Sequence, residues 1–197
     1  MLVYNRLPEL ELIFKSNIPG LDIDQVETTS RQIVYRYNRQ LLRNTLPPKI
    51  TELTFCHQYS RPIPTSDLLP ASLTSITFGK CFDSSLNGVL PPSLVTLVFT
   101  PASIFNKEFN VGSLPNTLTT LKFGYLYNQP FKSNVLPDSL LYLIFGEDSL
   151  FNKPIFPDIL PQSLVTLSLG SGYLHEINAR KLPRSLRSLS LGGGQIQ

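Results

Sequence analysis

The chain of 197 residues is long enough for one large domain or one repeat array, and its 42% apolar residues can form a core. It contains no apolar run near the length of about eighteen residues that a membrane helix needs. Its first residues lack the basic and apolar regions of a secretory signal, so we expect a cytoplasmic protein without a membrane segment. The net charge of +3 reflects basic residues near the C-terminal end, at Arg180, Lys181, Arg184 and Arg187.

Residues 1–45 do not share the pattern of the rest of the chain. A short helix is predicted from Glu9 to Lys15, and a longer one from Asp22 to about Asn38. The longer prediction rests on apolar residues that recur at helical spacing, namely Val26, Ile33, Val34 and Tyr37. We therefore predict a short helical N-terminal cap at residues 1–45. Such a cap would cover the apolar end of a repeat array.

A different interpretation of this segment comes from LPELELIF at Leu7–Phe14. It resembles the opening of an F-box, whose pattern begins with Leu-Pro, a Glu and an Ile-Phe-type pair. The resemblance implies that residues 1–45 dock a Skp-type ubiquitin-ligase adaptor. The segment is thus either a cap or a degenerate F-box-like segment.

The rest of the chain, residues 46–197, contains the motif LPxSLxxLxF seven times at intervals of 21 to 24 residues. The copies begin at Leu46, Leu69, Leu90, Leu114, Leu136, Leu160 and Leu182. A period of this length is typical of stacked repeats. Alternating apolar and polar residues predict one short, half-buried strand per copy, preceded by a proline that needs no ladder hydrogen bond.

Strands that are related by translation along a stack must be parallel, and parallel crossovers are right-handed. We therefore predict a mainly β repeat solenoid. It is a right-handed stack of seven repeats of about 22 residues with one parallel sheet.

A second motif follows each strand, after a turn that glycine frequently opens. Its second position is polar in every copy, and such side chains can bond backbone groups in turns without a regular ladder. We predict an internal hydrogen-bond ladder here rather than a catalytic site. The copies are YSRPI at Tyr59–Ile63, FDSSL at Phe82–Leu86, FNKEF at Phe105–Phe109, YNQPF at Tyr127–Phe131, FNKPI at Phe151–Ile155 and LHEI at Leu174–Ile177.

The two alternating motifs resemble the FNIP repeat family, over roughly three quarters of the chain. Repeats of this family are similar to leucine-rich repeats and abundant in social amoebae and giant DNA viruses, often behind an F-box. The resemblance implies a leucine-rich-repeat-like binding scaffold, located in the host cytoplasm if the chain is viral. It supplies neither a ligand nor a catalytic residue. The array departs from the family pattern at both ends, where Ile50 replaces the usual SL and no FNIP segment follows Gly192.

If the Leu and Phe of each strand point inward, the alternate residues share one outward sheet face. Hydroxyl side chains dominate these positions, as suits exposed strands. Tyr142 and Ile144, with Lys122 on the neighbouring strand, form an apolar and cationic spot of the kind that partners bind. The candidate partner-binding residues are Glu52, Thr54, Ser75, Thr77, Thr96, Val98, Thr120, Lys122, Tyr142, Ile144, Thr166, Ser168, Ser188 and Ser190.

Residues typical of catalytic or metal centres are sparse. Cys56 and Cys81 follow consecutive strands at unequal offsets, which favours free thiols over a disulfide. His57 and His175 lie far apart in the repeat array, and the sequence shows no zinc-ligand spacing, phosphate-binding glycine loop or nucleophile motif. We expect no enzyme activity, no metal and no cofactor.

Arg184 and Arg187 beside the last strand allow two interpretations. Charge at a sheet edge discourages pairing with another chain. The alternative is a basic patch for nucleic acid, but a few positive charges without interleaved aromatic residues make a small footprint. We therefore expect edge protection and no nucleic-acid partner.

The sequence supports two hypotheses of function. The first is a non-enzymatic scaffold that binds a protein partner through the sheet face and flanking loops. The second is a substrate-recognition subunit of an F-box-type ubiquitin ligase, in which residues 1–45 dock the adaptor. A threonine array for ice or a polysaccharide fits less well, because the outward positions include Glu52, Lys122, Tyr142 and Ile144.

Overall fold

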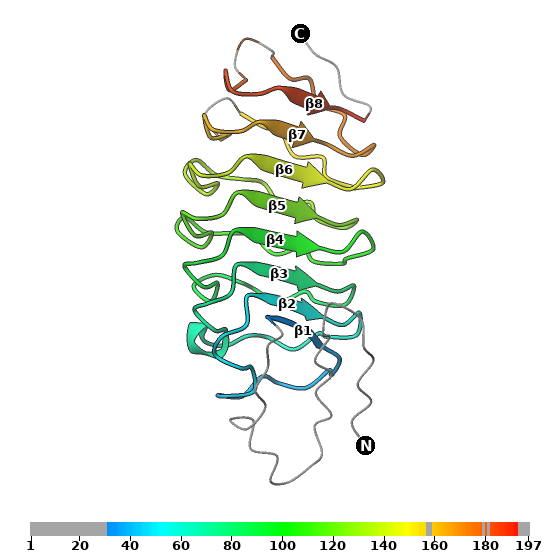
Figure 1. Ribbon diagram of the computed structural model, residues 1–197. Helices are drawn as coiled ribbons and strands as arrows, with labels where there is room; N and C mark the ends of the chain where they lie inside the picture. The colour runs from blue at the N-terminus through cyan, green and yellow to red at the C-terminus, as the bar shows by residue number, and fades with distance from the viewer. Residues whose placement is uncertain (1–30, 157–158, 179, 181, 193–197) are drawn as a thin grey trace.

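The computed structural model describes residues 31–156, 159–178, 180 and 182–192. Over these residues the chain forms one eight-stranded sheet whose strands follow in chain order (Figure 1). A short 3-10 turn, η2 (Ser66–Leu68), lies between two strands. The strands are β1 (Gln32–Tyr35), β2 (Glu52–Phe55), β3 (Ser75–Phe78), β4 (Thr96–Phe99), β5 (Thr120–Phe123), β6 (Tyr142–Phe145), β7 (Thr166–Ser168) and β8 (Ser188–Ser190).

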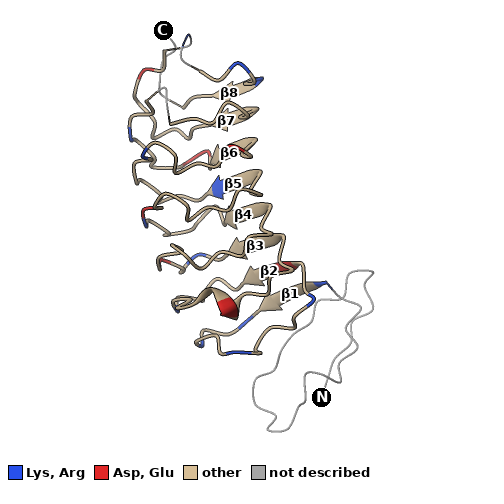
Figure 2. Ribbon diagram, turned by 90° about the vertical axis from the view of Figure 1, so that its left-hand side faces the viewer, with Lys and Arg blue, Asp and Glu red and all other residues tan. Residues whose placement is uncertain are grey.

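Each strand belongs to one coil of a solenoid, and all seven strand pairs are parallel. The strands run in one direction across the front of the stack, and the chain returns behind them as the coils climb (Figures 1 and 2). This makes the coil right-handed. The predicted leucine-rich-repeat-like stack with one parallel sheet is confirmed.

The first strand corrects the helix predicted from Asp22 to about Asn38. β1 lies inside that range and pairs with β2 residue for residue, from Gln32 opposite Glu52 to Tyr35 opposite Phe55. Ile33 and Tyr35 are buried and their neighbours are not, so the burial follows a period of two. The helix prediction is therefore wrong for the described residues of this range. A run rich in β-branched residues suits a strand when an open sheet edge is available.

The array thus begins before Leu46 and has one strand more than the seven motif copies. β1 is not preceded by an LPxSL segment, which is why the motif search missed it. The helix predicted from Glu9 to Lys15 and the F-box-like stretch lie outside the described residues.

Two columns of stacked aromatic rings fill the core. Rings at the strand ends are 4.9–5.6 Å apart between coils, at Phe55, Phe78, Phe99, Phe123 and Phe145. Rings of the second motif are 6.0–6.4 Å apart, at Tyr59, Phe82, Phe105, Tyr127, Phe151 and Tyr173. Within a coil the two rings stack at 3.7–4.3 Å. Burial raises the pKa of the Tyr127 hydroxyl well above its usual range, so this ring stays neutral in the core.

The serine of LPxSL joins each coil to the coil before it. Its hydroxyl donates to the carbonyl of the motif leucine or isoleucine one coil earlier, over 2.6–2.8 Å. The donors are Ser72, Ser93, Thr117, Ser139, Ser163 and Ser185. A hydroxyl is required here because the carbonyls lie beside the strands, where the sheet ladder does not reach them.

Turns of two lengths alternate in the middle of the stack. The turns after β4 and β6 contain a buried serine, Ser103 and Ser149, whose hydroxyl accepts a hydrogen bond from the backbone N–H two residues later. In the next coil a glycine lies directly above each of these turns, at Gly124 and Gly170. A methyl group at Gly124 would lie 2.2 Å from the Thr100 carbonyl oxygen and 2.7 Å from the Ser103 Cβ. The close approach of the two coils therefore requires a glycine at position 124.

We predict that Gly124→Ala lowers the free energy of unfolding by about 1–3 kcal/mol, because the added methyl group overlaps the turn beneath it. Gly146→Ala is the matched control, since its nearest neighbour would be the Phe123 carbonyl oxygen at 3.8 Å. Chemical denaturation of both variants measures the difference. Equal stabilities of the two variants would show that the stack accommodates the methyl group at position 124 without loss of stability, which would contradict the prediction.

Packing weakens toward the C-terminal end of the described stack. Leu121 in the middle is fully buried, whereas the equivalent Leu189 on β8 is only half-buried. Leu169 and Leu191 stand where the earlier coils have the strand-end phenylalanine. Each internal coil is covered on both sides, but β8 has a described neighbour only at β7.

We predict that Leu121→Ala costs about 2–5 kcal/mol of stability, since it leaves a cavity between two covered coils. Leu189→Ala should cost less than half as much, because its site is already open to solvent. Thermal unfolding of the two variants tests this. Equal melting temperatures would contradict the stacked core.

Candidate partner-binding surface

The sheet face contains all fourteen residues predicted to contact a partner. Each lies at an outward position of β2–β8, alternating with the buried residues of the core. Glu52, Lys122, Tyr142, Ser188 and Ser190 are exposed, and the other nine are half-buried. The predicted common face is confirmed. Their role in binding stays a prediction.

The centre of the face is built by three strands in strict register. Val98 on β4 lies opposite Lys122 on β5, which in turn lies opposite Ile144 on β6. In the adjacent row Thr120 lies opposite Tyr142. Tyr142 is 40% exposed and the next residue, Leu143, is fully buried, so the tyrosine ring lies on the outside of the sheet.

Beside the face lie three more apolar side chains that the sequence prediction missed. Val95 and Thr96 both lie outside the core, between the buried Leu94 and Leu97. The strict alternation of buried and outward residues therefore begins only at the second of the two residues. The equivalent positions on the later coils hold Thr119, Leu141, Val165 and Arg187, of which Leu141 and Val165 are apolar and half-buried. The signal in the sequence was the apolar residue directly after the motif leucine.

The turns at the far ends of the strands add two more exposed apolar side chains. Tyr125 follows β5 and Leu150 follows β6. They belong to adjacent coils, since the Leu150 N–H donates to the Tyr125 carbonyl over 2.9 Å. Gln32 and Val34 extend the face onto β1, which the sequence analysis did not include.

The strands alone make a small surface. Eight strands at about 4.8 Å spacing and about 13 Å long give an area of roughly 450 Å². A standard interface buries about 800 Å² on each partner. A partner of ordinary affinity must therefore also contact the apolar side chains beside the face and the turns at the strand ends.

The polar side chains of the second motif are used inside the fold, as predicted. In five coils an Asn or Asp Oδ1 atom accepts a hydrogen bond from the backbone N–H one coil later, over 2.8–3.0 Å, whereas the Ser60 hydroxyl of the first copy donates to the Asn38 Oδ1 atom. The acceptors are Asn38, Asp83, Asn106, Asn128 and Asn152. This ladder leaves these oxygens committed to structure rather than to a ligand.

The last step of the ladder corrects the alignment of the final copy. The Asn152 side chain accepts from the backbone of Leu174, and the ring that stacks on Phe151 is that of Tyr173. The copy therefore starts at Tyr173, and the polar position holds Leu174 rather than His175. A leucine has no acceptor, so the side-chain ladder ends at this coil.

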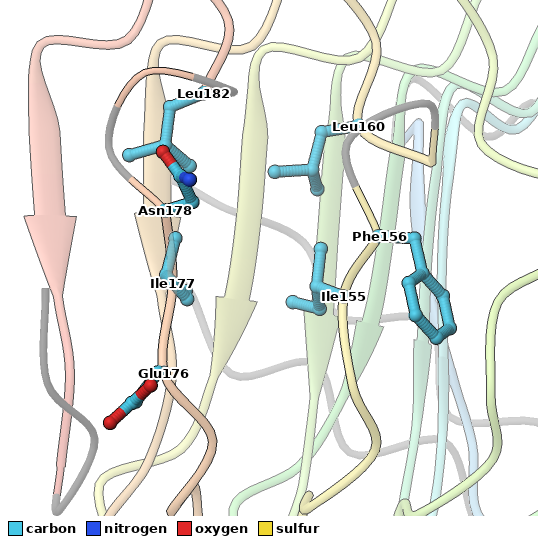
Figure 3. A pocket seen from close by; sticks show the side chains of 7 residues that line it. All are labelled: Ile155, Phe156, Leu160, Glu176, Ile177, Asn178 and Leu182. Atoms are coloured by element: carbon cyan, nitrogen blue, oxygen red, sulfur yellow. The ribbon is translucent and has the colours of Figure 1, made fainter. Parts of the chain in front are cut away.

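A pocket of about 140 Å³ lies between the returning segments of the sixth and seventh coils (Figure 3). It is walled mainly by apolar side chains, with Glu176 and Asn178 at one side. Typical small-molecule sites measure about 300–1,000 Å³, so this pocket is too small for a cofactor. The lining residues are Ile155, Phe156, Leu160, Glu176, Ile177, Asn178 and Leu182.

Other residues considered for chemistry are dispersed. Cys56 and Cys81 are free thiols. In the part of the chain that the structure describes, no three His, Cys, Asp or Glu side chains are grouped so as to hold a metal ion. A search of the same residues also finds no helix with the length and apolar character to cross a membrane.

Comparison with known proteins agrees with this architecture. The FNIP Repeat family profile matches residues 59–100, 105–148 and 151–194, well over half of the chain. Among solved structures, the crystal structure of CroV588, described as a novel circular LRR protein, is similar with a TM-score of 0.67 and 34% identity. The match covers 83% of this chain and 27% of that one.

A shorter similarity links the chain to a curated protein of Dictyostelium discoideum. It is 42% identical over 57 residues to the probable serine/threonine-protein kinase fnkA. Those residues make up 28% of this chain and 7% of the kinase. The chain therefore spans only a small part of each of these relatives.

Proposed function

Because the chain belongs to the FNIP repeat family, we propose that it is a non-enzymatic scaffold that binds a protein partner through its parallel sheet face and flanking turns. The observation that carries this proposal is the exposed ring of Tyr142 beside Ile144 and Lys122 at the centre of the sheet. Exposed aromatic residues on rigid surfaces are common anchors of protein interfaces.

The distribution of exposed apolar side chains supports the same surface. Of the eight large exposed hydrophobic side chains in the described residues, four lie on the face or beside it, on the coils of β4–β6. They are Val95, Tyr125, Tyr142 and Leu150. Monomeric proteins rarely gather apolar side chains on one surface unless it binds something.

We predict that the double variant Tyr142→Ala, Ile144→Ala loses protein partners that the intact chain captures from cell lysate. Removing both side chains flattens the anchor of the face but leaves the core unchanged, because neither is buried. Mass spectrometry of the captured proteins measures the loss. The matched control, Leu42→Ala with Val111→Ala, removes two exposed apolar side chains from turns away from the strands. If both variants recover the same partners as the intact chain, the chosen surface is wrong.

A second candidate is the substrate-recognition subunit of an F-box-type ubiquitin ligase. It is supported by the stretch Leu7–Phe14, which lies outside the described residues. In this role the sheet face would hold the target and the N-terminal segment would hold the adaptor.

We expect a purified Skp-type adaptor to bind the full chain and not a chain that starts at residue 31, if this second candidate is correct. The truncation leaves β1 and its pairing with β2 in place, so the solenoid serves as its own control. Size-exclusion chromatography of the mixtures is the measurement. If the adaptor binds neither chain, the ubiquitin-ligase candidate is excluded and the scaffold proposal remains.

A further inference from the structure

Among the described residues, the outward positions of the strands hold one cation without an ion pair or hydrogen bond. Among the sixteen outward positions of β1–β8 the charged side chains are Glu52 and Lys122. Glu52 accepts a hydrogen bond from the Gln32 side chain over 2.7 Å. Lys122 has no ion pair or hydrogen bond to any described residue. Figure 2 shows the strands mostly tan, with a blue segment on β5, the strand that contains Lys122.

Two other lysines of the stack are paired between coils. Lys107 contacts the Asp83 carboxylate at 2.8 Å, and Lys132 contacts Glu108 at 2.6 Å. Both pairs lie on the returning segments, where an acidic residue one coil earlier supplies the partner. On the sheet face the residues in register with Lys122 are Val98 and Ile144, which cannot pair with it.

The apolar neighbours set what Lys122 can bind. Adjacent strands are about 4.8 Å apart, so Val98 and Ile144 flank the lysine stem on both sides. A carboxylate that approaches the ammonium group between them is partly removed from water, and the attraction is then stronger than between fully hydrated charges. Apolar side chains next to that carboxylate would rest on Tyr142 and on Val95 and Leu141, which belong to the coils before and after that of Lys122.

We propose that the face binds a polypeptide segment that presents an Asp or Glu side chain between apolar residues, with the carboxylate on Lys122. This inference rests on the proposed scaffold function and specifies its partner. The face is about 34 Å long, which an extended segment of about ten residues spans. A nucleic acid does not fit, because one cation cannot neutralise a run of phosphates.

The test is selection of random peptides of about ten residues, displayed on phage, against the immobilised full chain. We expect the enriched peptides to carry Asp or Glu flanked by apolar residues. Against Lys122→Glu the same peptides should bind about tenfold more weakly or worse, and the selection should shift to Lys or Arg at that place. Lys80→Glu, an exposed lysine in the turn after β3, is the matched control and should leave the selection unchanged.

The outcomes separate this inference from the proposed function. Enriched peptides that depend on Tyr142 and Ile144 but show no acidic preference would overturn the inference and leave the scaffold in place. Enriched peptides that bind the Tyr142→Ala, Ile144→Ala variant equally well would overturn the proposed surface as well. Enriched acidic peptides that bind Lys122→Glu and Lys80→Glu alike would assign the carboxylate to another site.

Discussion

Backbone hydrogen bonding between successive coils is the constraint on which the rest of this structure depends. The same bond recurs along the stack, from the Thr51 N–H to the Arg31 carbonyl through to the Arg187 N–H and the Val165 carbonyl. It fixes the rise between coils at about 4.8 Å, so the side chains of each strand lie directly above their counterparts in the coil before. Aromatic rings must then stack on rings, and polar groups must find partners one coil above or below. The phenylalanines, the serines and the asparagines of the two motifs each meet one part of this requirement.

The same constraint explains where the repeats are free to vary. Extra residues enter the turns after β4 and β6, where Ser103 and Ser149 bond their own backbone. Gly124 and Gly170 in the following coils allow these wider turns to fit beneath them. The strand is three or four residues long in every described coil. Length variation is therefore absorbed at the ends of the sheet, next to the surface that we propose for binding.

Separation of the core from the sheet face makes this fold suitable for recognition. The residues that hold the coils together point inward or along the stack, while the outward strand residues are exposed or half-buried. The face can therefore change composition without loss of the ladder. Tyr142 and Lys122 are the positions where it departs most from the hydroxyl residues that suit an exposed strand.

The sequence by itself determined the repeat period, the inward and outward sides of β2–β8, the parallel stack and the ladder of polar side chains. These follow because a motif repeated at near-constant spacing adopts the same conformation each time and packs like on like. Only the tertiary structure decided that Gln32–Tyr35 is a strand, that Tyr173 opens the last copy, and that Val95 and Leu141 flank the face. The first two depend on a neighbouring coil, which supplies an open edge to pair with or a ring to stack on, and the third depends on how the chain enters each strand. Contacts between coils are set by distances in space, which no single repeat encodes.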